Sequence, residues 1–170
     1  MNFTIRKTSK KDIPLILEFI KEIAAYEKLS HQVTATETIL EESLFGETPQ
    51  AKVFFGEEEG IPVSYAVYFF NFSTFDGRHG LYLEDLFVKP EHRGKGYGKA
   101  LLKHLGKIAK EKGCLRMEWS VLDWNKSAID FYESLGAKPM DGWTVYRCTG
   151  EALQELADEK HSKLANNSSE

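Results

Sequence analysis

Hydrophobic residues in the first part of the chain follow a helical period in two segments. The first segment begins after Ser9 and Asp12, which can cap a helix, and is expected to continue to about Glu27. Its apolar side chains share one face of the predicted helix: Ile13, Ile16, Leu17, Ile20, Ile23 and Ala24. Thr36 is expected to open a second, shorter helix, which Gly46 closes.

Alternation of apolar and polar residues predicts the strands. Short strands are expected at residues 3–6, 52–57 and 63–72, and the turn at residues 58–60 should join the last two as a hairpin. A further strand is expected at residues 80–88.

The second half of the chain also contains segments with the helical period and segments with the alternation typical of strands. A helix with leucine, isoleucine and alanine on one face is expected to stop at Gly113, and a strand should follow at residues 115–122. Asn125 can cap a short helix that ends at Gly136. The last predicted elements are a strand at residues 143–149, a helix from residue 151 to about 164 and a disordered tail at residues 166–170.

This order of elements predicts an α/β fold in which helices cover both faces of a central mixed, mostly antiparallel sheet. The chain has 170 residues, of which 42% are hydrophobic and 28% charged, as in soluble globular proteins. We therefore expect residues 1–165 to form a single domain.

Charge, cysteines and hydropathy exclude several classes of partner. The net charge of −4 provides no field that would attract nucleic acid. Cys114 and Cys148 lie far apart and form no metal-binding or disulfide pattern, so no metal is expected. The longest apolar run, residues 66–70, is too short to cross a bilayer, and the N-terminus has no apolar export signal. A cytoplasmic location without membrane partners is expected.

The most informative segment joins the strand at residues 80–88 to the next helix and has the sequence VKPEHRGKGYGK, residues 88–99. Its glycines alternate at positions 94, 96 and 98, which keeps Cβ atoms away from a ligand and lets successive amides point at one anion. The following helix adds the positive end of its dipole. A loop that binds phosphate groups is predicted.

Other phosphate motifs fit this segment poorly. In the dinucleotide fingerprint the third glycine comes one residue later, and that motif lies near the first strand of its domain. A P-loop needs a hydroxyl residue where Ala100 follows Lys99. The pattern Arg-x-x-Gly-x-Gly after a Val-x-Pro strand end instead resembles the acetyl-CoA loop of the GCN5-related N-acetyltransferase (GNAT) superfamily. A simple tight turn is the alternative, but a single glycine would suffice for that.

The resemblance extends over nearly the whole chain and implies acetyl-CoA as cosubstrate. Within the family, the segment YLEDLFV at residues 82–88 closely resembles the diamine (spermidine/spermine) acetyltransferases. The implied contacts to acetyl-CoA are Leu86, Phe87 and Val88 on the strand, Arg93, Gly94, Lys95, Gly96, Tyr97, Gly98 and Lys99 in the loop, and Asn125, Ser127 and Ala128 further on.

Acetylation of a primary amine requires removal of a proton. With a pKa of about 10.4, as in lysine, roughly 1 amine in 2,500 is neutral at pH 7, which is a penalty of about 4.6 kcal/mol. The site therefore needs a base, a donor for the carbonyl oxygen and an acid for the thiolate.

Glu84 and Asp85 are two adjacent carboxylates within an apolar strand, where alternation sends them to opposite faces and makes at least one expensive to bury. A structural salt bridge or a sheet edge would also explain them. The resemblance implies that Glu84 lies at the amine site and helps to deprotonate the substrate through water, and that a bulge in this strand supplies the oxyanion donor.

Tyr132 is the candidate acid. Its position in the predicted helix at residues 126–135 is compatible with core packing, but the pattern Asn-x-x-Ala-x-x-Phe-Tyr-x-x-x-Gly-Ala resembles the second acetyl-CoA segment of the superfamily. In that family segment the tyrosine commonly protonates the coenzyme A thiolate, and the resemblance implies this role for Tyr132.

The amine pocket is inferred from the resemblance alone. Tyr26 and Glu27 resemble the pair that contacts the polyamine, and Asp141 occupies the position of a further acidic residue, although this chain is shorter between Gly136 and Gly142. Convergence of Glu27, Glu84 and Asp141 would create an acidic channel for a di- or polycation.

Two alternatives to polyamine acetylation stay open. The segment LDWN, residues 122–125, resembles the branch of the family that prefers thialysine-like amino acids, whose carboxylate would have Arg78 or Arg116 as a candidate partner. A binding module that senses acetyl-CoA without catalysis is the alternative from another class. The family also implies a homodimer, and neither cysteine lies in a motif that would make it a nucleophile.

Overall fold

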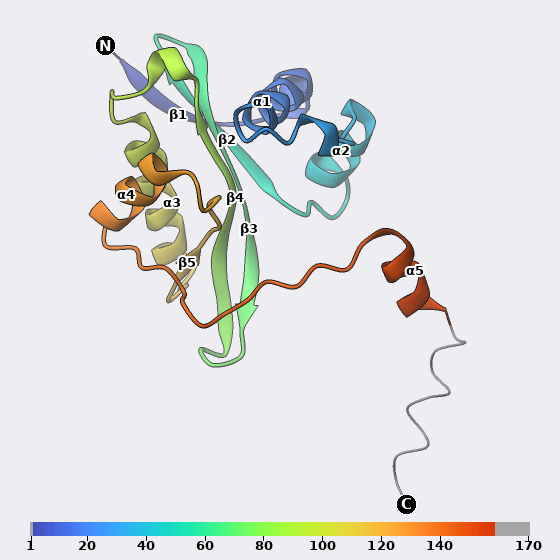
Figure 1. Ribbon diagram of the computed structural model, residues 1–170. Coiled ribbons are helices and arrows are strands. Elements are labelled where there is room, and N and C mark those ends of the chain that lie inside the picture. The colour runs from blue at the N-terminus through green and yellow to red at the C-terminus, as the bar shows by residue number, and fades with distance from the viewer. Residues whose placement is uncertain (1, 159–170) are drawn as a thin grey trace, which may run out of the picture. The chain divides into compact units, whose positions relative to one another are not determined.

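The computed structural model describes residues 2–158 and contains a five-stranded sheet in the order β1-β2-β3-β4-β5 (Figure 1). The strands are β1 (Phe3–Lys7), β2 (Lys52–Glu58), β3 (Ile61–Ser73), β4 (Arg78–Val88) and β5 (Met117–Glu118). Neighbours from β1 to β4 are antiparallel, and β5 runs parallel to β4. The predicted mixed, mostly antiparallel sheet is confirmed.

Helices cover both faces of this sheet. α1 (Ile13–Tyr26) and α2 (Glu37–Phe45) pack on one face, where Phe19 stacks on Tyr65 and lies near Phe55. α3 (Tyr97–Glu111) packs on the other face, where His104 meets the edge of the Phe54 ring. Phe54 and Phe55 are both buried because consecutive strand residues point to opposite faces and both faces are covered.

Local signals specify several element ends as predicted. The side chain of Thr36 accepts a hydrogen bond from the Ile39 amide at the start of α2. The Asp12 carboxylate accepts one from the Ser9 amide before α1. In the hairpin between β2 and β3, Glu59 and Gly60 both have positive φ, 51° and 80°, as the favoured two-residue turn requires.

A β-bulge interrupts the pairing of β3 with β4. Val67 lies opposite Asp85 and Tyr68 lies opposite Leu83, so Glu84 is the extra residue on β4. The bulge that the family resemblance implied for this strand is therefore present, and Glu84 is exposed there.

The chain forms two compact units, Met1–Asn125 and a second that begins at Lys126. The second unit contains α4 (Lys126–Ser134) and α5 (Gly150–Ala157). No helix within residues 2–158 is long and apolar enough to cross a membrane.

Two predicted strands differ from the structure. The strand at residues 143–149 is wrong, because within the described part of the chain this segment pairs with no strand; its residues, including Trp143 at 75% and Tyr146 at 93%, are exposed. The strand at residues 115–122 shortens to Met117–Glu118, since only these residues pair with β4. The predicted residues 159–164 of the last helix and the tail at 166–170 lie outside the described residues.

Candidate active site

The glycine segment between β4 and α3 has the geometry of an anion site. Gly94 and Gly96 adopt the left-handed conformation with φ of 76° and 84°, and a Cβ at either position would meet no atom within 4 Å. Gly96 is also the N-cap of α3. Within residues 2–158 the amides of residues 94–96 make no hydrogen bond, and those of Tyr97, Gly98 and Lys99 form the first turn of the helix, where amides lack intrahelical partners. Consecutive amides are therefore available to one anion.

Arg93 joins this loop to β4 and α1. Its Nε donates to the Val88 carbonyl oxygen over 2.9 Å, and its guanidinium lies over the rings of Tyr26 (4.5 Å) and Phe87 (5.5 Å). The predicted cofactor residue Arg93 and the predicted substrate residue Tyr26 are thus in direct contact.

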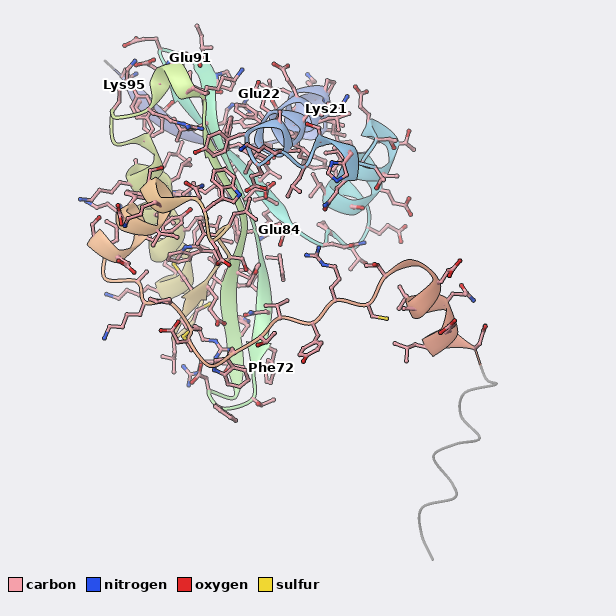
Figure 2. All side chains as sticks on the ribbon, viewed as in Figure 1. Lys21, Glu22, Phe72, Glu84, Glu91 and Lys95 are labelled. Carbon is pink, nitrogen blue, oxygen red and sulfur yellow. The ribbon has the colours of Figure 1, made fainter. Side chains whose placement is uncertain are left out.

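Lys95 is held from the opposite side of the loop. Its ammonium lies 2.8 Å from one carboxylate oxygen of Glu58, the last residue of β2. The sequence predicts Lys95 as a cofactor contact, and its ammonium is already paired, so the backbone amide is the group that it offers. Glu91 and Lys95 lie at one end of the sheet, and Glu84 lies further along β4 (Figure 2).

β4 has an open edge beside the loop. It pairs with β5 only through Leu81 and Tyr82, so the positions from Leu83 to Val88 have no strand partner on that side among the described residues. The side chain of Phe87 is buried against α1, so its polar contribution to a ligand is limited to the backbone. The predicted contacts at residues 86–88 thus lie on a strand segment that pairs with β3 on one side and with no described strand on the other.

Asp85 is the more buried carboxylate of the Glu84–Asp85 pair. The Tyr65 hydroxyl donates a hydrogen bond to Asp85 Oδ2 over 2.5 Å in the partly buried space below α1. Burial raises the pKa of Asp85, and the hydrogen bond from Tyr65 opposes that rise. The sequence identified the Glu84–Asp85 pair as unusual but assigned no role to Asp85, because the strand register was needed to tell the two apart.

Glu27 lies at the C-terminal end of α1, near Asp85. The pKa of Glu27 is raised, first by burial and then by the negative charge of Asp85. The pKa of Tyr65 is raised well above its usual value by burial and by Asp85, with smaller effects of Glu27 and Glu84. These effects show that Glu27, Glu84 and Asp85 all act on one hydroxyl group, and we call them the carboxylate cluster.

Aromatic rings and one cation border this cluster. The ring of Trp124 lies 6.1 Å from that of Tyr26, and the Lys28 ammonium lies 5.4 Å from the centre of the Trp124 ring. Lys28 follows Glu27 directly and has a positive φ of 62°. Its ammonium makes no ion pair with any described carboxylate.

The remaining predicted residues lie further along the chain. Asn125 ends the first unit, and its amide donates to the Leu122 carbonyl oxygen. Ser127, Ala128 and Tyr132 lie on α4 in the second unit, and Asp141 is exposed in the irregular segment that follows.

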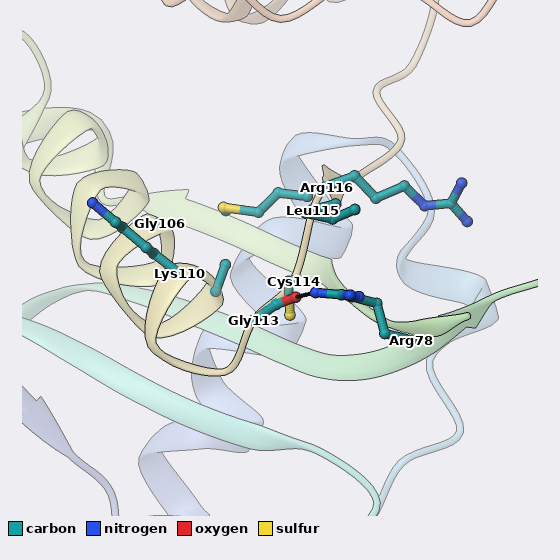
Figure 3. Close-up of a pocket in the computed structure, with 9 residues that line it drawn as sticks. Arg78, Gly106, Lys110, Gly113, Cys114, Leu115 and Arg116 are labelled. Atoms are coloured by element: carbon teal, nitrogen blue, oxygen red, sulfur yellow. Dashed lines mark hydrogen bonds between the residues drawn. The ribbon is translucent and has the colours of Figure 1, made fainter. Parts of the chain in front are cut away.

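Arg78 and Arg116, considered as partners for a substrate carboxylate, line a different groove. This groove of about 390 Å³ lies between the end of α3 and the start of β4 (Figure 3). Arg116 pairs with Glu118, and Arg78 donates to the Gly113 carbonyl oxygen. Six strand residues, or about 20 Å, separate Arg78 from Glu84 along β4. Cys114 also lines the groove, and burial raises the pKa of its thiol, which disfavours a nucleophile.

An antiparallel sheet that ends in a parallel strand, with a glycine loop of free amides between β4 and α3, defines a class of α/β enzymes that bind phosphate-bearing ligands. The chain belongs to the acetyltransferase (GNAT) family, whose model matches residues 18–137. It is an N-acetyltransferase, and family membership implies the use of acetyl-CoA.

Three relatives illustrate the similarity. The chain is 43% identical to thialysine N-epsilon-acetyltransferase of Bos taurus, over 90% of this chain and 96% of that protein. It is 31% identical to L-ornithine N5-acetyltransferase NATA1 of Arabidopsis thaliana, over 89% and 86% respectively. Among solved structures, an integron cassette protein of V. cholerae is 31% identical, with a TM-score of 0.77, over 92% of this chain and 98% of that chain.

Proposed function

We propose that this enzyme transfers the acetyl group of acetyl-CoA to the primary amine of a small cationic substrate, first a thialysine-like amino acid and second a di- or polyamine. The observation that carries the proposal is that a site suited to a cation lies on β4 and a site suited to an anion lies in the loop that follows β4. The carboxylate cluster includes Glu84 and Asp85 on β4, and the free amides of the glycine loop begin nine residues after Asp85, at Gly94. A cationic amine and an anionic thioester donor would meet between them.

The loop is suited to the diphosphate of acetyl-CoA. The free amides of residues 94–99 and the N-terminus of α3 would bind its oxygens, and the open edge of β4 at residues 86–88 would orient the arm that carries the thioester. The bulge at Glu84 turns the local backbone and supports the expected amide donor for the thioester oxygen.

The chemistry proceeds by direct attack. Glu84, which is exposed at the bulge, accepts the ammonium proton through water, and the neutral amine then attacks the thioester carbon. The carbon–sulfur bond breaks, and the hydroxyl of Tyr132 protonates the departing thiolate. The attacking nitrogen loses its second proton to water as the amide forms, and a proton from water restores the Tyr132 hydroxyl. The raised pKa of the Cys114 thiol is consistent with a mechanism that has no covalent enzyme intermediate.

The substrate order follows from the relatives and from Lys28. The thialysine acetyltransferases of Bos taurus, Sus scrofa and Mus musculus are 40–43% identical to this chain over 90% of its length. That of Caenorhabditis elegans is 32% identical, and the human spermidine/spermine N(1)-acetyltransferase-like protein 1 is 33% identical. An amino acid also needs a partner for its carboxylate. Lys28 supplies a cation beside Glu27 and Trp124 that forms no ion pair with a described residue, which makes it a better candidate than Arg78 or Arg116.

The test is the release of coenzyme A in the presence of putrescine, spermidine, spermine, ornithine or thialysine. The proposal expects the highest kcat/KM with thialysine, and it expects Lys28→Met to lower kcat/KM for amino acids while leaving putrescine within about twofold. Lys21→Met, on the exposed side of α1, is the control. If acetyl-CoA binds but no amine stimulates release, the protein is a sensor module instead.

A further inference from the structure

One carboxylate outside the reacting groups holds three side chains of the glycine segment. Glu58 ends β2, and its Oε2 lies 2.6 Å from Nδ1 of His92. Its Oε1 accepts hydrogen bonds from the Lys95 ammonium at 2.8 Å and the Tyr97 hydroxyl at 2.5 Å. His92, Lys95 and Tyr97 lie before, within and after the pair of left-handed glycines, so one side chain spans the whole turn. We call these four residues the Glu58 cluster.

Two members of the cluster, Glu58 and Tyr97, are shielded from water. The side chain of Glu58 is only 11% exposed, and the Tyr97 ring stacks on Phe3 of β1 with 4.1 Å between ring centres. Lys95 and Tyr97, followed by His92, hold the pKa of Glu58 down at about 2, so this carboxylate is ionised throughout the physiological range.

We propose that Glu58 is a positioning residue for the diphosphate of acetyl-CoA. It fixes the glycine segment to the sheet before the ligand arrives, so that the free amides of residues 94–99 already point in one direction. Ordering of the loop then costs little free energy when acetyl-CoA binds. The proposal rests on the proposed function, because it assumes that the loop receives acetyl-CoA.

The charge of Glu58 allows two opposite effects of its replacement on the affinity for coenzyme A, so the sign of the change tests the proposal. A carboxylate near a diphosphate is repulsive, and replacing it with a neutral amide would strengthen binding if repulsion were its main effect. The three donors that surround Glu58 offset its charge, so we expect the loss of loop order to dominate.

The experiment compares Glu58→Gln with Glu57→Gln by titration calorimetry with coenzyme A. Glu57 is the preceding residue of the same strand, is 13% exposed and forms an ion pair with Arg6 away from the loop, which makes it a matched control. We expect Glu58→Gln to raise the Kd about tenfold or more, corresponding to the loss of one charged hydrogen bond, and Glu57→Gln to change it less than twofold.

Kinetics separate positioning from a general structural role. With Glu58→Gln, the KM for acetyl-CoA should rise as the Kd does, while kcat at saturation and the KM for the amine stay within about twofold. S-acetylpantetheine lacks the diphosphate, so its kcat/KM should be the same in both proteins.

A second variant, Tyr97→Phe, tests the same contact if Glu58→Gln does not fold. Tyr97→Phe removes one donor to Glu58 but keeps the ring on Phe3, and it should weaken coenzyme A binding by a smaller factor. Combined with Glu58→Gln it should add little, because both variants remove the same contact.

Each outcome is decisive. If the wild-type enzyme does not bind coenzyme A, the proposed function fails. If the wild type binds and Glu58→Gln binds equally well or more tightly, the positioning role is overturned. Equal weakening by Glu57→Gln, or equal loss with S-acetylpantetheine, would also overturn it.

Discussion

The pKa values of two carboxylates of the sheet, Glu58 and Asp85, are shifted in opposite directions because their neighbours differ. Glu58 faces a lysine, a tyrosine and a histidine, which lower its pKa to about 2. Asp85 is partly buried and accepts a hydrogen bond from the Tyr65 hydroxyl, and its burial raises its pKa. Glu58 therefore stabilises the fold above the pKa of an unfolded glutamate, and this contribution is lost as the pH falls toward 2. Ionisation of Asp85 acts in the opposite direction, since its cost appears as the pH rises through its raised pKa.

Tyr65→Phe tests the environment of Asp85. The variant removes the hydrogen bond that lowers the pKa of Asp85, so the carboxylate becomes harder to ionise. We expect a loss of about 1–3 kcal/mol in the free energy of unfolding at pH 8 and a smaller loss at pH 4, where a larger fraction of Asp85 is protonated. Urea unfolding at both pH values measures the difference. The same loss at both values would mean that the hydrogen bond does not favour the ionised form.

Glu84→Gln tests the proposed base. Without this carboxylate the ammonium proton has to leave to bulk water, so the pH–rate profile should move to higher pH and the rate at pH 7 should fall by about 10²-fold or more. Glu42→Gln, on the exposed face of α2, is the control. A pH–rate curve identical to that of the wild type would assign the proton to another group.

Tyr132→Phe tests the proposed acid. The variant keeps the aromatic ring and removes the proton donor, so kcat should fall by roughly 10²-fold or more while the Kd for acetyl-CoA stays within about twofold. Stopped-flow and titration calorimetry provide the two values. An unchanged kcat in Tyr132→Phe would contradict the assignment.

At the scale of elements, the conformation of the β4–α3 segment matters more than its side chains. Its left-handed glycines turn the chain so that β4 passes into α3 with a row of free amides. Arg93 fixes one side of this segment to β4 and α1, and Glu58 fixes the other to β2. The loop is therefore held by three different elements.

Gly96→Ala should damage this element specifically. A Cβ at φ of 84° strains the backbone, although it meets no neighbouring atom. The expected cost is about 1–2 kcal/mol in the free energy of unfolding, together with weaker coenzyme A binding. Gly106→Ala, within α3, is the matched control and should stabilise the protein by about 0.5–1 kcal/mol. Chemical denaturation and calorimetry measure both effects, and equal results for the two variants would refute a special role for Gly96.

At the scale of the whole molecule, we propose that residues 1–165 act as one acetyltransferase domain within a homodimer whose amine site includes residues of the second subunit, as the family resemblance implies. Exposed aromatic and aliphatic side chains at Trp143, Val145 and Tyr146 are consistent with a contact surface. The apolar character of this segment is what predicted a strand there.

Sedimentation velocity tests this assembly. We expect a species of about twice the chain mass of 19.4 kDa at micromolar concentration, with specific activity that falls on dilution as the dimer dissociates. A monomer with constant specific activity would contradict the shared amine site.

Much of the fold was predictable because its signals are local. The periodicity in α1, the cap at Thr36 and the turn at Glu59 and Gly60 all depend on residues within a few positions of one another. The prediction of a strand at residues 143–149 was wrong because a strand depends on a partner elsewhere in the chain, which its own residues do not specify.

The sequence by itself determined the family, the glycine loop between β4 and α3 and the order of the elements from β1 to α4, because periodicity, alternating glycines and short motifs act through their own backbone. Only the tertiary structure decided that Asp85 is more buried than Glu84, that the Lys95 ammonium pairs with Glu58, and that the Lys28 ammonium lies over the Trp124 ring. Each of these facts depends on the strand register and on contacts between residues far apart in the chain, which local patterns do not encode.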